Sequence, residues 1–117
     1  MTVTPESVQQ LISSADYGDR IRALNQLSHL DPAIAFELVQ PAITDANPRV
    51  RYSAVCKVGS LGTQDLTRSL TILRDRLHND PELDVKAAAA DSLGALKLTE
   101  AFEDLHQVYY STSDWII

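Results

Sequence analysis

The chain has 117 residues, of which 44% are hydrophobic and 6% aromatic, and its formal net charge is −6. This length suits a single domain, and a core so poor in aromatic residues must consist mainly of Leu, Ile, Val and Ala, as in closely packed helices. The negative charge argues against nucleic acid as the main partner, because phosphate binding requires a basic surface.

The first half of the chain predicts three helices, over residues 5–14, over residues 20–30 and from Pro32 onward. Thr4 and Asp31 are capping residues, and each precedes a proline, which suits the first helical position because its missing N–H costs nothing there. Residues 16–19 form an expected turn between the first two helices. Pro41 should end or kink the third helix, since proline cannot donate a helical hydrogen bond.

The second half predicts four further helices, over residues 48–60, 66–78, 83–96 and 99–110. Asn47 should cap the first of these, Thr63 the second and Thr99 the last. No segment alternates apolar and polar residues with a period of two, so we predict no β-sheet.

One apolar pattern occurs twice. Its residues recur at helical spacing, with Val50, Ala54, Val58 and Leu61 in the first copy and Val85, Ala89, Leu93 and Leu96 in the second. We expect Gly59 and Gly62 to let the chain turn out of the first copy. A repeat at this spacing predicts a stacked solenoid.

The first helix pair is a degenerate copy, and its register has two solutions. Aligning Ala23 with Ala54 offsets the copies by 31 residues, whereas aligning Arg22 with Arg51 offsets them by 29. We prefer the first, because packing faces constrain register more than surface charges do.

The predicted fold is therefore all-α, a right-handed α-α superhelix with three helix pairs and the start of a fourth. The pairs cover about residues 4–30, 32–62, 63–97 and, incompletely, 99–117 of one array. The end of the chain, residues 115–117, is apolar, unlike the polar caps of most solenoids. We expect that the array is truncated there or self-associates through this end.

The repeated residues resemble HEAT repeats, in which a loop Asp, a Val-Arg pair, an Ala and an apolar residue with Gly recur. They are Asp45, Val50, Arg51, Ala54, Val58, Gly59 and Leu61, and in the second copy Asp80, Val85, Lys86, Ala89, Leu93, Gly94 and Leu96. The acid-to-base spacing allows a loop Asp of each pair to meet a helical Arg or Lys. Lys86 departs from the usual Arg, which can bind a carboxylate at two points.

A closer resemblance, over residues 19–21, 31–38, 49–55 and 84–96, is to phycobilin lyase and phycobilisome degradation proteins of cyanobacteria. It implies a phycobiliprotein partner and a match to the N-terminal part of a longer protein. A bilin cofactor is implied by this resemblance alone.

Sequence motifs give no metal site and no catalytic residue. His29, His78 and His106 are far apart and lack metal-ligand spacing, and no serine or cysteine lies in a nucleophile motif. A single cysteine is compatible with a reducing cytosol, and neither a signal peptide nor an apolar run of about 20 residues is present. We therefore predict a cytoplasmic protein without a membrane span.

The second helices of successive pairs should line one curved surface. Cys56 lies about 200° from Ala54 around the helix, away from the packing stripe. We expect partner contacts on this surface from Arg22, Asn25, Gln26, Arg49, Tyr52, Cys56, Lys57 and Asp91. The alternative is an ordinary solvated face.

These observations predict a non-catalytic protein-binding scaffold without a cofactor, and the resemblance implies that it engages phycobiliproteins. One alternative is a bilin lyase or a chaperone subunit that handles a bilin. Such a site needs cations for the propionates and an acid near the pyrrole nitrogens, which Arg49, Arg51, Tyr52 and Asp91 could supply. A second alternative is a helical repeat module with another protein partner.

Overall fold

The computed structural model describes the backbone of residues 2–111 and the side chains of residues 2–97. This part of the chain contains six α-helices, three short 3-10 helices and no strand, so the all-α prediction is confirmed. The α-helices are α1 (Pro5–Ile12), α2 (Tyr17–Gln26), α3 (Pro32–Val39), α4 (Pro48–Leu61), α5 (Leu66–Asn79) and α6 (Leu83–Ser111). The 3-10 helices are η1 (Leu27–His29), η2 (Gln40–Thr44) and η3 (Gly62–Gln64).

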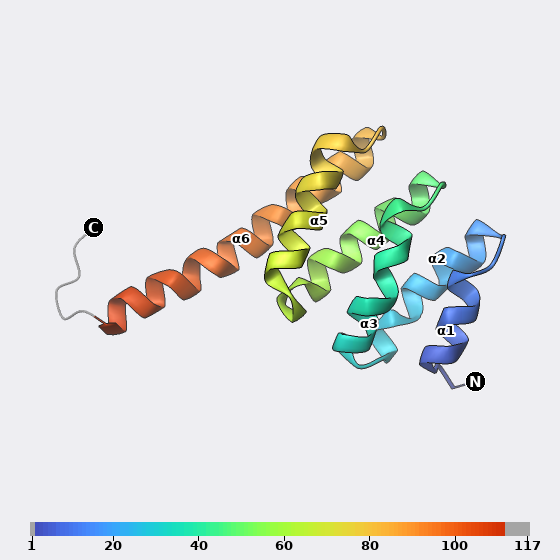
Figure 1. Cartoon of the computed structure of the whole chain (residues 1–117), viewed down its shortest axis with the longest axis horizontal. Helices are drawn as coiled ribbons and strands as arrows, with labels where there is room; N and C mark the ends of the chain where they lie inside the picture. The colour runs from blue at the N-terminus through green and yellow to red at the C-terminus, as the bar shows by residue number, and fades with distance from the viewer. Residues whose placement is uncertain (1, 112–117) are drawn as a thin grey trace.

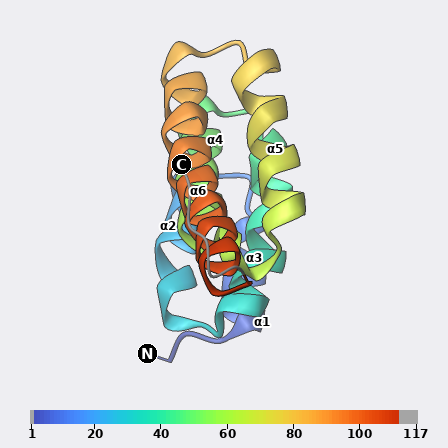
Figure 2. The same ribbon diagram turned by 90° about the vertical axis from the view of Figure 1, so that its left-hand side faces the viewer.

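The helices form two layers (Figures 1 and 2). One layer holds α1, α3 and α5, and the other holds α2, α4 and α6. Each helix of the first layer packs against the next helix of the chain, and α4 packs against both α2 and α6. This arrangement is a helical-repeat solenoid, in which each pair contacts its neighbours.

Three of the expected N-caps are present. Thr4, Asp31 and Asn47 each accept a backbone hydrogen bond from the first turn of the helix that follows. The proline prediction is also confirmed, because α3 ends just before Pro41 and the chain continues as the 3-10 helix η2.

Two helix starts differ from the prediction. The helix expected from Arg20 begins at Tyr17, because the Asp16 carboxylate accepts a 3.0 Å hydrogen bond from the Gly18 amide and caps the helix. Thr63 does not cap α5. Asp65 does so, since its carboxylate accepts a hydrogen bond from the Arg68 amide at 3.0 Å.

The predicted apolar stripe forms the core. Val50, Ala54 and Val58 have no exposed surface, and the second copy is buried in the same way, at Val85, Ala89, Leu93 and Leu96. Ile34 is an exception among the apolar residues of α3, because its side chain is exposed.

Gly59 does not turn the chain out of the first copy, which corrects that part of our expectation, whereas Gly62 follows the end of α4 and opens the 3-10 helix η3. Gly59 lies inside the helix, and no described glycine has a positive φ. A Cβ on Gly59 would lie 2.5 Å from Ser92 Oγ, and one on Gly62 would lie 2.5 Å from Leu96 Cδ1. Both glycines therefore allow α6 to approach closely.

The expected break at Thr99 is absent, since α6 continues without interruption from Leu83 to Ser111. The physical reason is local, because residues 94–99 contain no proline and are rich in strong helix formers. The last part of α6 extends past α5 in Figure 1. The expectations for residues 112–117, including self-association through 115–117, lie outside the described residues.

Ion pairs between successive repeats decide the register of the first copy. Arg20 Nε donates to Asp45 Oδ2 at 2.8 Å, and Arg51 Nε donates to Asp80 Oδ2 at 2.9 Å. Both arginines also donate to a carbonyl six residues back, that of Ser14 or Asp45. Arg20 is therefore the equivalent of Arg51, which confirms the offset of 31 residues.

Candidate functional site

A groove runs between α4 and α6 on the layer formed by the second helices. Its larger hollow has a volume of about 750 Å³ and is lined by Ile21, Pro48, Arg49, Tyr52, Ser53, Glu82, Asp84, Val85, Ala87, Ala88 and Asp91. A second hollow of about 320 Å³ is lined by Tyr52, Cys56, Gly59, Ser60, Ala88, Asp91, Ser92 and Ala95. Tyr52, Ala88 and Asp91 line both hollows, so the two are adjacent and together form the groove.

The structure brings four of the eight predicted contact residues together in this groove. They are Arg49, Tyr52, Cys56 and Asp91. The other four, Arg22, Asn25, Gln26 and Lys57, do not line it. Arg22 is mostly exposed and pairs with Asp19 at 3.4 Å, one turn away on the same helix.

Sequence reasoning missed most of the α6 wall. Asp84, Ala88 and Asp91 share one face of α6, because residues four and three apart are neighbours on a helix. This spacing is visible in the sequence. Asp84 and Asp91 are exposed and lie off the buried stripe that defines the repeat.

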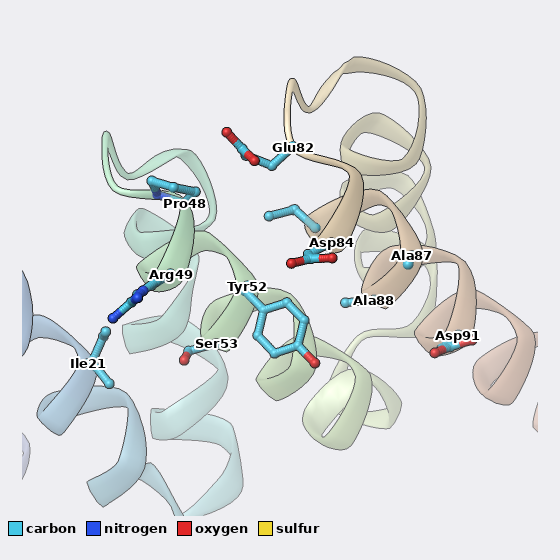
Figure 3. A pocket seen from close by; sticks show the side chains of 11 residues that line it. Ile21, Pro48, Arg49, Tyr52, Ser53, Glu82, Asp84, Ala87, Ala88 and Asp91 are labelled. Atoms are coloured by element: carbon cyan, nitrogen blue, oxygen red, sulfur yellow. The ribbon is translucent and has the colours of Figure 1, made fainter.

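Tyr52 stands in the middle of the groove. Its side chain is 46% exposed, and Figure 3 shows the ring between α4 and α6, with Asp84 near the start of α6 and Asp91 further along that helix. The Arg49 side chain extends away from α6, toward Ile21 on α2. The groove thus has an aromatic centre, an acidic α6 wall and a cation at its opposite edge.

The thiol of Cys56 reaches solvent at the second hollow, as predicted from its place off the packing stripe. Partial burial raises the pKa of this thiol above its ordinary value, and the charge of Asp91 adds to the effect. A hydrogen bond from Tyr52 and the charge of Lys57 act in the opposite direction without reversing it. The thiol is therefore protonated at neutral pH, unlike activated cysteines, whose pKa is lowered.

Arg51 does not belong to this groove, although its neighbours Arg49 and Tyr52 do. Its side chain is buried, and its guanidinium contacts both carboxylate oxygens of Asp80 as well as the Asp45 and Ala46 carbonyls. All its strong contacts are intramolecular. The suggestion that Arg51 could bind a bilin propionate is therefore wrong.

Within the described residues, no group of three or more His, Cys, Asp or Glu side chains is placed to hold a metal ion. No described helix is both long and apolar enough to cross a membrane.

The chain matches the family model for HEAT repeats over residues 4–94. It belongs to the HEAT-repeat family. Residues 85–110, which lie in α6 of this HEAT-repeat array, also match the model of the PBS lyase HEAT-like repeat. Comparison with curated proteins and with solved structures gave no significant match.

Proposed function

We propose that this HEAT-repeat protein is a non-catalytic cytoplasmic scaffold that binds a protein partner in the groove between α4 and α6. The observation that carries the proposal is the pair of adjacent hollows between α4 and α6, with the half-exposed ring of Tyr52 lining both. Solenoids use such extended surfaces for recognition, and HEAT repeats are protein-interaction modules.

We further propose that the partner is a phycobiliprotein subunit, handled during maturation or degradation of the light-harvesting complex. The match of residues 85–110 to the PBS lyase HEAT-like repeat supports this choice, because that segment includes Asp91 of the groove wall.

The same match favours a second candidate, a bilin lyase or a chaperone subunit that presents a bilin. Arg49, Tyr52 and Asp91 line one groove and could contact the propionates and pyrrole nitrogens of a bilin. Against a nucleophilic role of Cys56, its raised pKa keeps the thiol in its unreactive form.

Titration calorimetry with isolated phycobiliprotein subunits tests the scaffold proposal. The Tyr52→Ala variant should lose binding, since aromatic anchors carry much of the energy of an interface. Tyr17→Ala is the matched control, because Tyr17 is equally exposed, at 43%, but lies outside the groove. Absence of binding by the unaltered protein would overturn the choice of partner.

Absorbance spectra separate the two candidates. A scaffold should leave the spectrum of added bilin unchanged, whether or not the apo-phycobiliprotein is present. A shift that requires Arg49 and Asp91 would establish bilin handling instead.

A further inference from the structure

The charges and the aromatic ring of the groove between α4 and α6 indicate which kind of protein segment it binds. Resting on the proposed function, we propose that the groove takes a basic helical segment of the partner. Two basic residues of this segment, seven positions apart, pair with Asp84 and Asp91, and one of them also lies against the Tyr52 ring.

The shape of the groove suits a helix. Its walls extend from Pro48 to Ser60 on α4 and from Asp84 to Ala95 on α6, with Glu82 just before that helix, a length of about 20 Å at the helical rise per residue. Small residues, among them Gly59, Ala88 and Ser92, line the groove where α4 and α6 pack closely, so no bulky side chain blocks it there. A helix laid in a groove is a common mode of peptide recognition.

The charge of the groove is acidic on the α6 side. Glu82, Asp84 and Asp91 are exposed there, and within residues 2–97 none of their carboxylates forms an ion pair or a side-chain hydrogen bond. Arg49 does not neutralise them, because its side chain extends toward α2 (Figure 3).

The two aspartates stand apart from every other aspartate whose side chain is described. Of the others, three cap helices (Asp16, Asp31 and Asp65), and four form ion pairs (Asp19, Asp45, Asp75 and Asp80). Asp84 lies in the first turn of α6, where the helix dipole favours a negative charge. Asp91 lies two turns further on, beyond the reach of the helix dipole. It has no intramolecular partner among the described residues.

The ring of Tyr52 offers a second attraction for a basic side chain of the partner, besides the carboxylates. A guanidinium or ammonium group is attracted to the face of a tyrosine within about 6 Å of the ring centre. Tyr52 presents such a ring in the groove beside the two carboxylates (Figure 3). Asp84 and Asp91 are separated by seven residues, about 10 Å along α6, which matches two cations seven residues apart on a partner helix.

A designed peptide tests this chemistry without the natural partner. The probe is an alanine-based peptide of about 20 residues, long enough to be helical, with two arginines seven residues apart. A second peptide carries glutamate at the same two positions. We expect the protein to bind the arginine peptide only, with an affinity that falls as salt increases, because salt screens exposed charges.

Two double variants locate the binding. Asp84→Asn/Asp91→Asn should weaken binding about tenfold, a value typical of losing two partly exposed charge pairs. Glu6→Gln/Glu37→Gln removes the same charge from exposed positions outside the groove and should change the affinity less than about twofold. Equal losses in both variants, or equal binding of both peptides, would overturn the proposal. Circular dichroism melting confirms that each variant is folded.

The ring is tested in the same assay. Tyr52→Phe keeps the aromatic face and should retain most of the affinity, whereas Tyr52→Leu should lose several-fold, because the attraction between cation and ring disappears. Equal affinity of the two variants would remove the ring from the proposal.

The two proposals fail separately. If phycobiliprotein subunits do not bind but the arginine peptide does, the partner is wrong and the groove chemistry stands. If the subunits bind, and Tyr52→Ala removes binding while Asp84→Asn/Asp91→Asn leaves it unchanged, the scaffold role stands and the basic occupant is wrong.

Discussion

Arg51 and Asp80, 29 residues apart in the chain, form a two-point ion pair inside the protein. Arg51 Nε lies 2.9 Å from Asp80 Oδ2, and Nη2 lies 3.3 Å from Oδ1. The side chains are 10% and 0% exposed. The pair joins α4 to the loop before α6, so it ties one repeat to the next.

Removing the carboxylate should destabilise the fold strongly. In Asp80→Asn the buried guanidinium of Arg51 loses its counter-charge, and breaking a buried pair from one side costs about 3–5 kcal/mol. Urea unfolding followed by circular dichroism measures this loss.

Asp75→Asn is the matched control, since Asp75 is 52% exposed and pairs with Arg76 at the surface. An exposed pair contributes about 1 kcal/mol or less. Equal losses in the two variants would contradict the assignment of the main contribution to the buried pair.

The same carboxylate predicts a dependence of stability on pH. Burial acts to raise the pKa of Asp80, but hydrogen bonds from Arg51 and from the Glu82 amide, together with the charges of Arg51 and Arg76, outweigh it and lower the pKa below its ordinary value. A lowered folded-state pKa stabilises the native state above the unfolded-state pKa, and this contribution is lost as the pH falls through the folded-state pKa.

We therefore expect the free energy of unfolding contributed by Asp80 to be constant above about pH 5 and to fall below about pH 4. Hydrogen bonds from Arg76 and Asn79 also lower the pKa of Asp75, but solvent screens that exposed group. Urea midpoints from pH 2 to pH 7 measure the profile. Asp80→Asn should flatten it, and an unchanged slope in this variant would contradict the prediction.

Gly59→Ala should destabilise the packing of α4 on α6. The new methyl group would lie 2.5 Å from Ser92 Oγ and 2.9 Å from Ser92 Cβ, so a hydroxyl rotation alone cannot relieve the overlap. Overpacking typically costs about 1–3 kcal/mol, which outweighs the gain of about 1 kcal/mol in helix propensity.

Gly94→Ala separates these two effects. A methyl group on Gly94 meets nothing within 4 Å, so the propensity gain should raise the melting temperature. If both alanine variants shift the melting temperature in the same direction, the close approach at Gly59 does not decide its stability.

Cys56 should react with iodoacetamide in the native protein, because it is exposed, but more slowly at pH 7 than an unperturbed thiol. Asp91→Asn should speed the reaction, since removing a negative charge lowers the pKa of the thiol. Lys57→Gln should slow it for the opposite reason. Mass spectrometry of timed samples gives the rates, and a lack of reaction in the native protein would contradict the exposure of Cys56.

Local signals in the sequence were sufficient for much of the fold. Thr4, Asp31 and Asn47 cap helices as predicted, because a capping side chain and its amide lie in the same turn. The stripe that begins at Val50 is buried as predicted, since helical spacing alone decides which residues share a face. For the candidate site, the same reasoning placed Tyr52 and Cys56 off the packing stripe.

The errors arose where a residue had two competing roles. Thr63 and Asp65 can both cap a helix, and the chain uses the second. Gly59 suits a helix end, but it lies inside α4 and allows a close helix contact. For Gly59 the role depends on its contact with Ser92 of α6, which is 33 residues away in the chain.

The sequence by itself determined the repeat, the helix faces and the charge of the chain, because these follow from spacing and residue type within one or two helical turns. Only the tertiary structure decided that the Asp45 carboxylate pairs with Arg20 of the preceding repeat rather than with Arg51 of its own, and that Asp84 and Asp91 share a groove with Tyr52. These relationships depend on the distance and direction between helices that are far apart in the chain. They are set by the packing of whole helices, through contacts such as that of Gly59 with Ser92.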